Sequence, residues 1–345
     1  MIEIDGSHGE GGGQLVRTAV ALAAVRGRAI RVVDVRARRR NPGLAPQHLA
    51  AIRAVAAMCE ARCDGLELRS RSFSFVPGRP RGGEFRVDVG TAGSVTLVLQ
   101  AMLPVAVACG EPCAIWLRGG TDVRAAPPAD YLNLVLLPLL RPLGVRATLA
   151  IDRRGYYPRG GGEVRVELAP VGRLSPWVAQ VPGPLQRLEV RAHVAQLDRH
   201  IAERMAQAAI DALPPGLPVA REVEVIGADR SAGPGGAVLV RALAAATVLG
   251  AAEVAQRGVR AEQLGQAAGA SVARDLVAGA TVDPHAADQL LAFLALADGE
   301  SRLRVREVSS HARTAMWLIE RLLGARFSVE PDGPCSRVRV MPSPA

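Results

Sequence analysis

The sequence predicts an α/β protein made of α+β sandwich units, in which a sheet covers one side and helices the other. Short apolar segments rich in β-branched residues alternate with longer apolar segments of helical length, and this alternation is typical of strands packed against helices. The order strand-helix-strand-helix-strand-strand also recurs, with corresponding elements about eighty residues apart. We therefore expect three β-α-β-α-β-β repeats, with a small α/β domain inserted before the third.

The first two repeats are expected in the first half of the chain. A glycine-rich turn separates the first strand from an apolar helix that begins near Gln14 and stops at Gly27, a residue suited to a helix C-terminus. The predicted elements of the first repeat are a strand at 2–5, a helix from 14, a strand at 30–36, a helix at 45–59 and paired strands around 66–75. Those of the second are a strand at 85–89, a helix from 94, a strand at 113–117, a helix at 130–140 and strands at 145–151 and 163–168.

Proline and glycine bound the segment that follows, at 182–184 and at Gly279, as is common at domain boundaries. We therefore predict a repeat domain over 1–180 and 282–345, and an inserted domain over 181–281. The inserted domain is expected to contain a strand at 188–194, a helix at 199–213, strands at 223–226 and 237–242, and a helix at 261–276. The third repeat is expected to contain a helix at 284–297, a strand at 302–306, a helix at 312–323 and strands at 327–330 and 337–340.

The composition excludes several kinds of chemistry. The 345-residue sequence contains no lysine, so all 42 of its basic residues are arginine. A P-loop with its phosphate-binding lysine is therefore excluded, as are a lysine nucleophile and a lysine Schiff base. Any nucleotidyl transfer by this chain needs another nucleophile.

Charge and cysteine content indicate the partners and the compartment. A net charge of +9 favours an anionic partner such as a nucleic acid or a nucleotide. Five cysteines without a disulfide framework suit a reducing compartment. No signal peptide is recognisable, and the longest apolar run, at 97–109, is too short to span a membrane. We expect a cytoplasmic protein with no membrane partner.

The first glycine loop, at 5–14, has features of an anion site. Glycines at a helix entrance expose backbone N–H groups and let an anion approach closely. Glu10 lies among these glycines, and Arg17 lies in the first helical turn, where the helix dipole disfavours a cation unless an anion is bound. A helix N-cap with a surface arginine is the alternative interpretation.

A second loop, at 35–48, carries an arginine cluster that includes Arg36 and Arg39 and ends near Gln47. Several guanidinium groups on one loop suit bidentate phosphate binding, although a solvated basic loop has the same composition. Loops at the same strand ends of one sheet converge on a common crevice. This placement favours phosphate binding next to the Glu10 loop.

Polar residues interrupt three other apolar segments. Gln100 is the polar residue within 97–103, and Asp288 and Gln289 lie in an apolar helix that opens with Asp283-Pro284-His285. Each is either satisfied internally or directed at a ligand. His311 follows two serines that can cap the last helix. The positive helix end keeps an imidazole neutral, and a neutral imidazole is a competent nucleophile toward phosphorus. A capping or core group is the alternative interpretation of His311 from its local sequence. We interpret His8, His48, His193 and His200 as capping or core groups.

Taken together, these segments resemble the RNA 3'-terminal phosphate cyclase family over essentially the whole chain. The matching segments are Asp5-Gly6 with 9–14 and Arg17, then 36–48, 93–100, 119–122, 127–130, Tyr157-Pro158, 233–235, 287–289, and His311 with Thr314.

The resemblance implies ATP-dependent conversion of an RNA 3'-terminal phosphate to a 2',3'-cyclic phosphate. In this chemistry a histidine becomes a covalent histidinyl-AMP, AMP passes to the RNA 3'-phosphate, and the 2'-hydroxyl then closes the ring. By resemblance, His311 is the nucleophile, and Glu10 binds a divalent cation, Mg²⁺ or Mn²⁺. The ATP site is implied to contain Gln100, Pro128, His285, Ala286, Ala287, Asp288 and Gln289, with Pro128 and His285 flanking the adenine. The RNA 3'-phosphate is implied to bind Arg17, Arg36, Arg39 and Gln47.

Two alternatives follow from the same resemblance. A non-catalytic cyclase-like protein of ribosome biogenesis would keep the fold and bind RNA or proteins, but such relatives lack the histidine-centred nucleotide site that this sequence retains. Enolpyruvyl transferases share the fold, but their sites need lysine. The partners expected for the enzyme are ATP and RNA with a 3'-terminal phosphate, and homodimerisation is left open.

Overall fold

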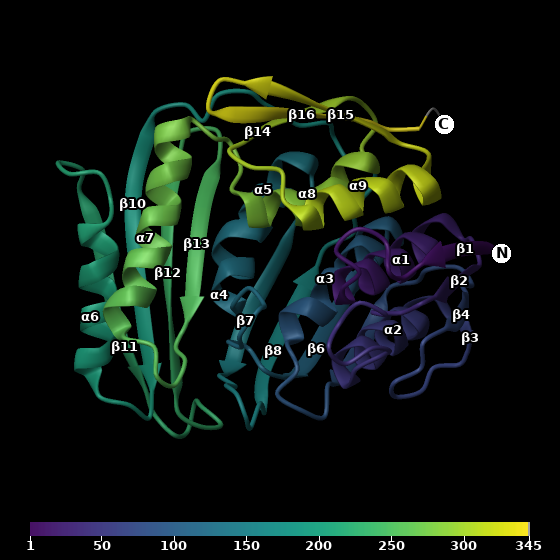
Figure 1. Ribbon diagram of the computed structural model, residues 1–345, viewed down its shortest axis with the longest axis horizontal. Coiled ribbons are helices and arrows are strands. Elements are labelled where there is room, and N and C mark those ends of the chain that lie inside the picture. Colours follow the sequence, from purple (N-terminus) through teal and green to yellow (C-terminus); the bar gives the residue numbers. More distant parts are fainter. Residues whose placement is uncertain (344–345) are drawn as a thin grey trace.

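The computed structural model describes residues 1–343 and confirms a mixed α/β protein (Figure 1). Within these residues the strands form four mixed sheets of four strands each. Figure 1 shows three of the sheets around a central group of helices, with the fourth sheet and its own two helices at one side.

The first sheet has the strand order β1-β2-β4-β3. Its first two strands are parallel, and the other pairs are antiparallel. In chain order its elements are β1 (Ile2–Asp5), α1 (Gly13–Arg26), β2 (Ile30–Val33), α2 (Pro46–Cys59), β3 (Arg62–Asp64) and β4 (Phe73–Val76).

The second sheet repeats this pattern in the order β5-β6-β8-β7, again with one parallel pair followed by antiparallel pairs. A short π-helical turn (Leu132–Leu136) interrupts its second helical segment. The other elements are β5 (Gly83–Asp88), α3 (Val95–Ala108), β6 (Cys113–Gly119), α4 (Ala129–Tyr131), α5 (Leu137–Leu140), a 3₁₀ turn (Arg141–Leu143), β7 (Ala147–Arg153) and β8 (Gly162–Leu168).

The third sheet has the order β15-β16-β14-β9. Its strand β9 (Val178–Ala179) pairs in parallel with β14, although about 120 residues separate them in the chain. Two residues are too few for a recognisable strand pattern, so the sequence did not predict β9. The remaining elements are α8 (Pro284–Ala295), β14 (Ser301–Val305), α9 (Ser310–Leu323), β15 (Arg326–Asp332) and β16 (Cys335–Met341).

The fourth sheet, β11-β10-β12-β13, lies in the chain between β9 and α8. Helices α6 and α7 pack on it and enclose a separate apolar core. Strand β13 was not predicted, because alanine and glycine make up much of its sequence and give no strand pattern. The elements are β10 (Leu185–Ala195), α6 (Arg199–Asp211), β11 (Val219–Ile226), β12 (Gly235–Ala244), β13 (Val248–Val254) and α7 (Ala261–Ala278).

Three predicted strands need correction in the first unit. The strand expected at 30–36 ends at Val33, because Asp34 and Arg36 take left-handed φ angles of 49° and 53°. The paired strands expected around 66–75 lie instead at β3 and β4. Between them the backbone of Arg69 and Ser70 bonds to Leu44 at 2.8 and 3.0 Å, so this stretch covers the arginine loop and joins no sheet.

Helices from the first three units meet at the centre of the molecule. Helix α1 packs on α3 and α9, and α8 packs on α9 and α3, within one continuous apolar core. The N-terminal ends of these helices carry several of the predicted site residues, so the packing of the core determines where those residues meet.

Candidate active site

A cavity of about 370 Å³ opens where the three helical units meet the fourth sheet. Seven of the side chains predicted from the sequence line it: Arg17, Gln100, Pro128, His285, Asp288, Gln289 and His311. They come from α1, α3, α8, α9 and the N-cap of α4. The fold therefore brings together residues that are up to about three hundred positions apart in the chain.

His311 lies in the first turn of α9. Ser309 caps this helix by accepting a hydrogen bond from the Ala312 N–H at 3.0 Å. The imidazole Nδ1 lies 3.4 Å from Glu10 Oε2. Burial, with the nearby charges of Arg17 and Arg39, holds the pKa of His311 below its ordinary value. The imidazole is therefore neutral near pH 7, as a nucleophile must be.

Glu10 reaches His311 because the glycine loop is docked on α9. Gly9 and Gly11 have φ angles of 56° and 57°, which glycine adopts without strain. The Glu10 N–H donates to Thr314 Oγ1 at 3.3 Å. A Cβ on Gly9 would come within 2.5 Å of the same hydroxyl, so the close approach requires glycine. Arg39 forms an ion pair with the Glu10 carboxylate and also donates to the Glu10 carbonyl at 3.1 Å.

The cavity wall also contains a buried cation. Arg17 is 7 % exposed, and its Nε has no hydrogen-bond partner among residues 1–343. Burial lowers its pKa to about 10. Burial and the neighbouring Asp283 raise the pKa of Asp288 to about 8, so this carboxyl is largely protonated at pH 7 and does not neutralise Arg17. A guanidinium whose charge is not neutralised is suited to binding an anion.

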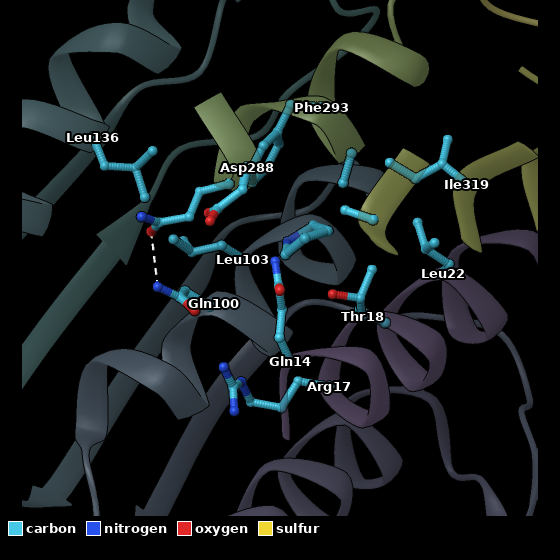
Figure 2. A pocket seen from close by; sticks show the side chains of 15 residues that line it. Gln14, Arg17, Thr18, Leu22, Gln100, Leu103, Leu136, Asp288, Phe293 and Ile319 are labelled. Atoms are coloured by element: carbon cyan, nitrogen blue, oxygen red, sulfur yellow. Dashed lines mark hydrogen bonds between the residues drawn. The ribbon is translucent and has the colours of Figure 1, made fainter. Parts of the chain in front are cut away.

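A smaller cavity lies beside the first, between α1, α3, α8 and α9 (Figure 2). Gln100 donates to Gln289 Oε1 at 2.8 Å, and a dashed line at Gln100 marks this hydrogen bond in Figure 2. The Gln289 amide donates in turn to the His285 carbonyl at 2.8 Å. The two glutamines are thus joined to each other at the base of the larger cavity.

Asp283 holds three walls of the larger cavity together, a role not predicted from the sequence. Its carboxylate caps α8 by accepting from the N–H groups of His285 and Ala286, both at 3.0 Å. It also accepts from the Tyr131 hydroxyl at 2.6 Å and from the Gly250 N–H of β13 at 3.2 Å. An aspartate directly before Pro284 is an N-cap signal, but its bonds to Tyr131 and β13 depend on tertiary packing.

Some predicted site residues lie outside the cavity lining. Ala286 and Ala287 are buried in the first turn of α8. Arg36 donates to the Gly43 carbonyl at 2.9 Å, which closes its own loop. Gln47 lies against Gly93, where an added Cβ would come within 3.1 Å of the Gln47 Cβ. His48, interpreted as a capping group, accepts from the Ala45 N–H at 3.0 Å.

The fourth sheet contributes a wall that the sequence did not predict. Ala252, Glu253 and Val254 of β13, followed by Gln256, line the cavity. Arg124, in the loop before α4, lines it as well. None of these residues belongs to a recognisable local motif, and β13 reaches the site only through the packing of the fourth sheet.

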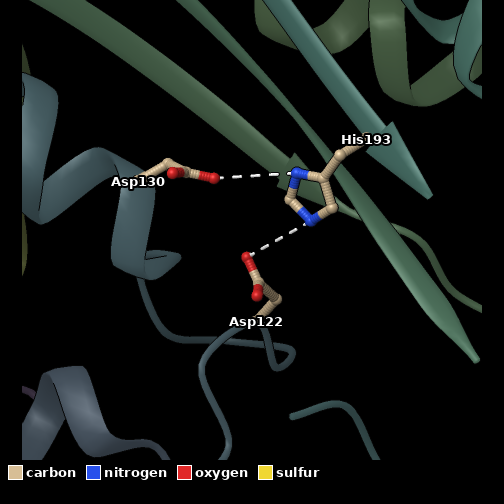
Figure 3. A group of neighbouring side chains, drawn as sticks. All are labelled: Asp122, Asp130 and His193. Carbon is tan, nitrogen blue, oxygen red and sulfur yellow. Dashed lines mark ion pairs between the residues drawn. The ribbon is translucent and has the colours of Figure 1, made fainter. Parts of the chain in front are cut away.

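A second polar cluster lies between the loops of the second unit and β10. Figure 3 shows His193 between Asp122 and Asp130, with nitrogen–oxygen distances of 3.9 and 3.6 Å. These three are the residues within 1–343 that are grouped closely enough to hold a metal ion. However, Arg154 Nη1 lies 2.7 Å from Asp130 and 3.2 Å from Asp122. The guanidinium already occupies the place of a metal's positive charge beside both carboxylates, so the cluster is interpreted as an internal ion-pair group.

The fold and the cavity define an α/β protein in which a histidine, a carboxylate and a buried arginine from different units come together at one site. The family model for RNA 3'-terminal phosphate cyclase matches residues 8–329. Cyclases of that name from Nitrosospira multiformis, Methanopyrus kandleri and Pyrococcus furiosus are 52 %, 42 % and 39 % identical. Each comparison covers 99 % of this chain and 97 %, 99 % and 99 %, respectively, of the relative.

The chain therefore belongs to the RNA 3'-terminal phosphate cyclase family, and its activity is that of this family, as the sequence predicted. The enzyme is supported over the non-catalytic alternative. Among the helices of residues 1–343, none combines the length and the apolar character needed to cross a membrane.

Proposed function

We propose that the large cavity binds ATP and that His311 attacks its α-phosphorus to form a covalent histidinyl-AMP. AMP then passes to an RNA 3'-terminal phosphate, and the 2'-hydroxyl attacks that phosphate to give the 2',3'-cyclic phosphate and free AMP. The observation that supports this most is the position of His311, a neutral imidazole that lines the same cavity as the unneutralised Arg17.

The orientation of His311 supports one ring nitrogen as the nucleophile. Nδ1 faces the Glu10 carboxylate at 3.4 Å, which favours the tautomer with the proton on Nδ1. The lone pair of Nε2 is then available for attack. Pro128 and His285, which both line the cavity, would flank the adenine, and Gln100, Asp288 and Gln289 would hold the nucleotide.

A divalent cation fits the Glu10 carboxylate. Mg²⁺ typically takes one or two carboxylates together with phosphate oxygens of the substrate. The Arg39 guanidinium pairs with this carboxylate, which shows that the position accepts a positive charge. When bound, the cation would neutralise phosphate charge. Arg39, released from Glu10, would join Arg36, Gln47 and Arg17 around the RNA 3'-phosphate.

The architecture supports three finer proposals. The shared strand pattern of the first three sheets supports three β-α-β-α-β-β repeats. The separate core of the fourth sheet supports an inserted domain over 181–281, within a repeat domain of 1–180 and 282–345. The five cysteines are free thiols, in keeping with a cytoplasmic location, while homodimerisation stays a prediction.

The decisive experiment is incubation with α-labelled ATP followed by denaturing gel electrophoresis. The wild-type protein should acquire label that is lost in acid and retained in alkali, as expected for a phosphoramidate. His311→Ala should acquire none, whereas His200→Ala, which changes an exposed histidine of α6, should label normally. Full labelling of His311→Ala would show that another residue is the nucleophile.

A further inference from the structure

Arg124 is a cation at the cavity that the predicted chemistry leaves without a role. It lines the cavity together with His311, and its side chain is exposed. Among residues 1–343 its guanidinium makes no ion pair and no hydrogen bond. A free guanidinium at the wall of a substrate cavity is suited to an anionic part of the substrate.

The loop that carries Arg124 is held firmly at both ends. The Ala129 N–H donates to the Thr121 carbonyl at 2.9 Å, closing the loop. Thr96 Oγ1 donates to the Pro127 carbonyl at 2.7 Å, and Arg154 holds Asp122 at 3.2 Å. The position of Arg124 is therefore determined by buried bonds on both sides of it.

The residue after Arg124 has a strained backbone. Ala125 has a φ of 59°, in the left-handed region that an alanine rarely adopts. Such strain persists only where surrounding contacts determine the conformation, and it concentrates at ligand-binding sites. The strain gives a second, independent indication that the loop is shaped for a ligand.

Three other arginines that the sequence predicted at this site are already engaged or enclosed. Arg39 pairs with Glu10, and Arg36 donates to Gly43. Arg17 is buried in the cavity wall and can bind one part of a triphosphate. Because the chain has no lysine, arginine is the side chain available, beside a bound divalent cation, to pair with the remaining phosphate charge. Arg124 is the free cation among these residues of the described chain.

We propose that Arg124 binds the β- and γ-phosphates of ATP and stabilises pyrophosphate as it leaves, an inference that rests on the assignment of this cavity to ATP. In this step a nitrogen–phosphorus bond forms between His311 and the α-phosphorus. The bond from the α-phosphorus to its bridging oxygen breaks, and its electron pair stays on pyrophosphate. The imidazole proton passes to solvent. Arg124 contacts the group on which negative charge increases, so its effect falls on this step.

The test separates the two chemical steps with three variants: Arg124→Ala, Arg124→Lys and the control Arg141→Ala. Arg141 is an exposed arginine of the same unit that lines a separate groove. Labelling with α-labelled ATP measures the first step, and inhibition of that step by inorganic pyrophosphate measures binding of the leaving group. Adding a 3'-phosphorylated RNA to previously adenylylated enzyme, with ATP removed, measures the second step.

Arg124→Ala should lower the kcat/KM of labelling by about ten- to a hundredfold, the loss expected for a charge-assisted contact. Inhibition by pyrophosphate should weaken in parallel, while transfer from the adenylylated enzyme to RNA stays unchanged. Arg124→Lys should recover part of the loss, since it keeps the charge without the bidentate geometry. Arg141→Ala should match the wild type.

Two results would overturn the inference. Loss of RNA transfer with normal labelling would place Arg124 in the RNA site. Normal labelling and normal pyrophosphate inhibition would show that Arg124 has no such role. In that second case, Gln289→Ala separates the proposal for Arg124 from the proposal that this cavity binds ATP. A raised KM for ATP would reject only the role of Arg124 and leave the cavity assigned to ATP. An unchanged KM would reject the assignment of the cavity itself.

Discussion

The chain builds two clusters from the same three kinds of group, an imidazole, a guanidinium and carboxylates, and the clusters differ in burial. In the first, His311 lies 3.4 Å from Glu10, which pairs with Arg39. In the second, His193 lies between Asp122 and Asp130, and Arg154 pairs with both carboxylates. The His311 side chain is 44 % exposed and that of His193 only 7 %.

We propose that this difference in burial separates a reactive group from a structural one. The buried cluster contains two carboxylates against one guanidinium, and its histidine has a pKa lowered by burial and by Arg154. It joins the second unit to the fourth sheet, and exchanging its charges would mean breaking buried pairs. In the open cluster Arg39 is an exposed residue, and exposed ion pairs are weak. Glu10 can therefore exchange partners during a reaction.

The sharpest test of this contrast substitutes the two histidines by asparagine. His311→Asn should lower adenylylation by more than about a thousandfold, because it removes the nucleophile. His193→Asn should label at close to the normal rate and should lower only the melting temperature. Labelling rates and thermal unfolding, measured on both variants, check this. A large loss of labelling in His193→Asn would show that the buried cluster takes part in the chemistry.

The two arginines should differ in their effect on stability. Arg154→Ala leaves two carboxylates unpaired, and Asp122 is fully buried, so the free energy of unfolding should fall by about 3–5 kcal/mol. Arg39→Ala removes an exposed partner and should cost less than about 1 kcal/mol. Urea denaturation of both variants measures the difference. Similar small losses would mean that water reaches the Asp122 cluster.

The sequence was sufficient to predict the open cluster but not the buried one. Glu10 and His311 lie in glycine-rich and serine-capped turns whose local pattern indicates chemistry. Asp122 and Asp130 stood in a loop with no assigned role, and His193 was interpreted as a lone core residue. Their meeting depends on how β10 packs against the second unit. The same holds for β13 and for the bonds of Asp283, which are determined by tertiary contacts and leave no local pattern.

A third comparison separates the steps of the reaction. Arg36→Ala and Arg39→Ala should leave labelling by ATP largely intact, while cyclisation of a 3'-phosphorylated RNA falls about ten- to a hundredfold. Lysine at either position should restore only part of the activity, because it lacks the bidentate fork. Single-turnover assays of each step measure this. Failure of both alanine variants to form the adenylylated enzyme would assign the arginine loop to the ATP site instead.

The exchange of partners at Glu10 predicts a metal effect. Glu10→Ala should depress labelling by about tenfold, the loss of one favourable charged contact. Raising the concentration of Mg²⁺ or Mn²⁺ should restore part of the rate, since the phosphates still bind the ion. A titration of each metal against the labelling rate checks this in wild type and variant. The same metal dependence in both proteins would exclude Glu10 as a ligand.

The smallest expected effect is a shift in a pH profile. The pKa of His311 is lowered by burial and by the charges of Arg17 and Arg39, and only the neutral imidazole attacks. The part of the labelling rate that His311 determines should therefore stay constant down to about pH 6.5 and decline only below that value, as the imidazole gains its proton. In Arg39→Ala one of the repelling charges is gone and Glu10 is unpaired. Both changes favour the protonated ring, so its pKa rises and the decline should begin at higher pH. A decline that began at the same pH in both proteins would show that the charge of Arg39 does not affect the pKa of His311. The three groups of the open cluster would then behave as isolated side chains, without electrostatic coupling.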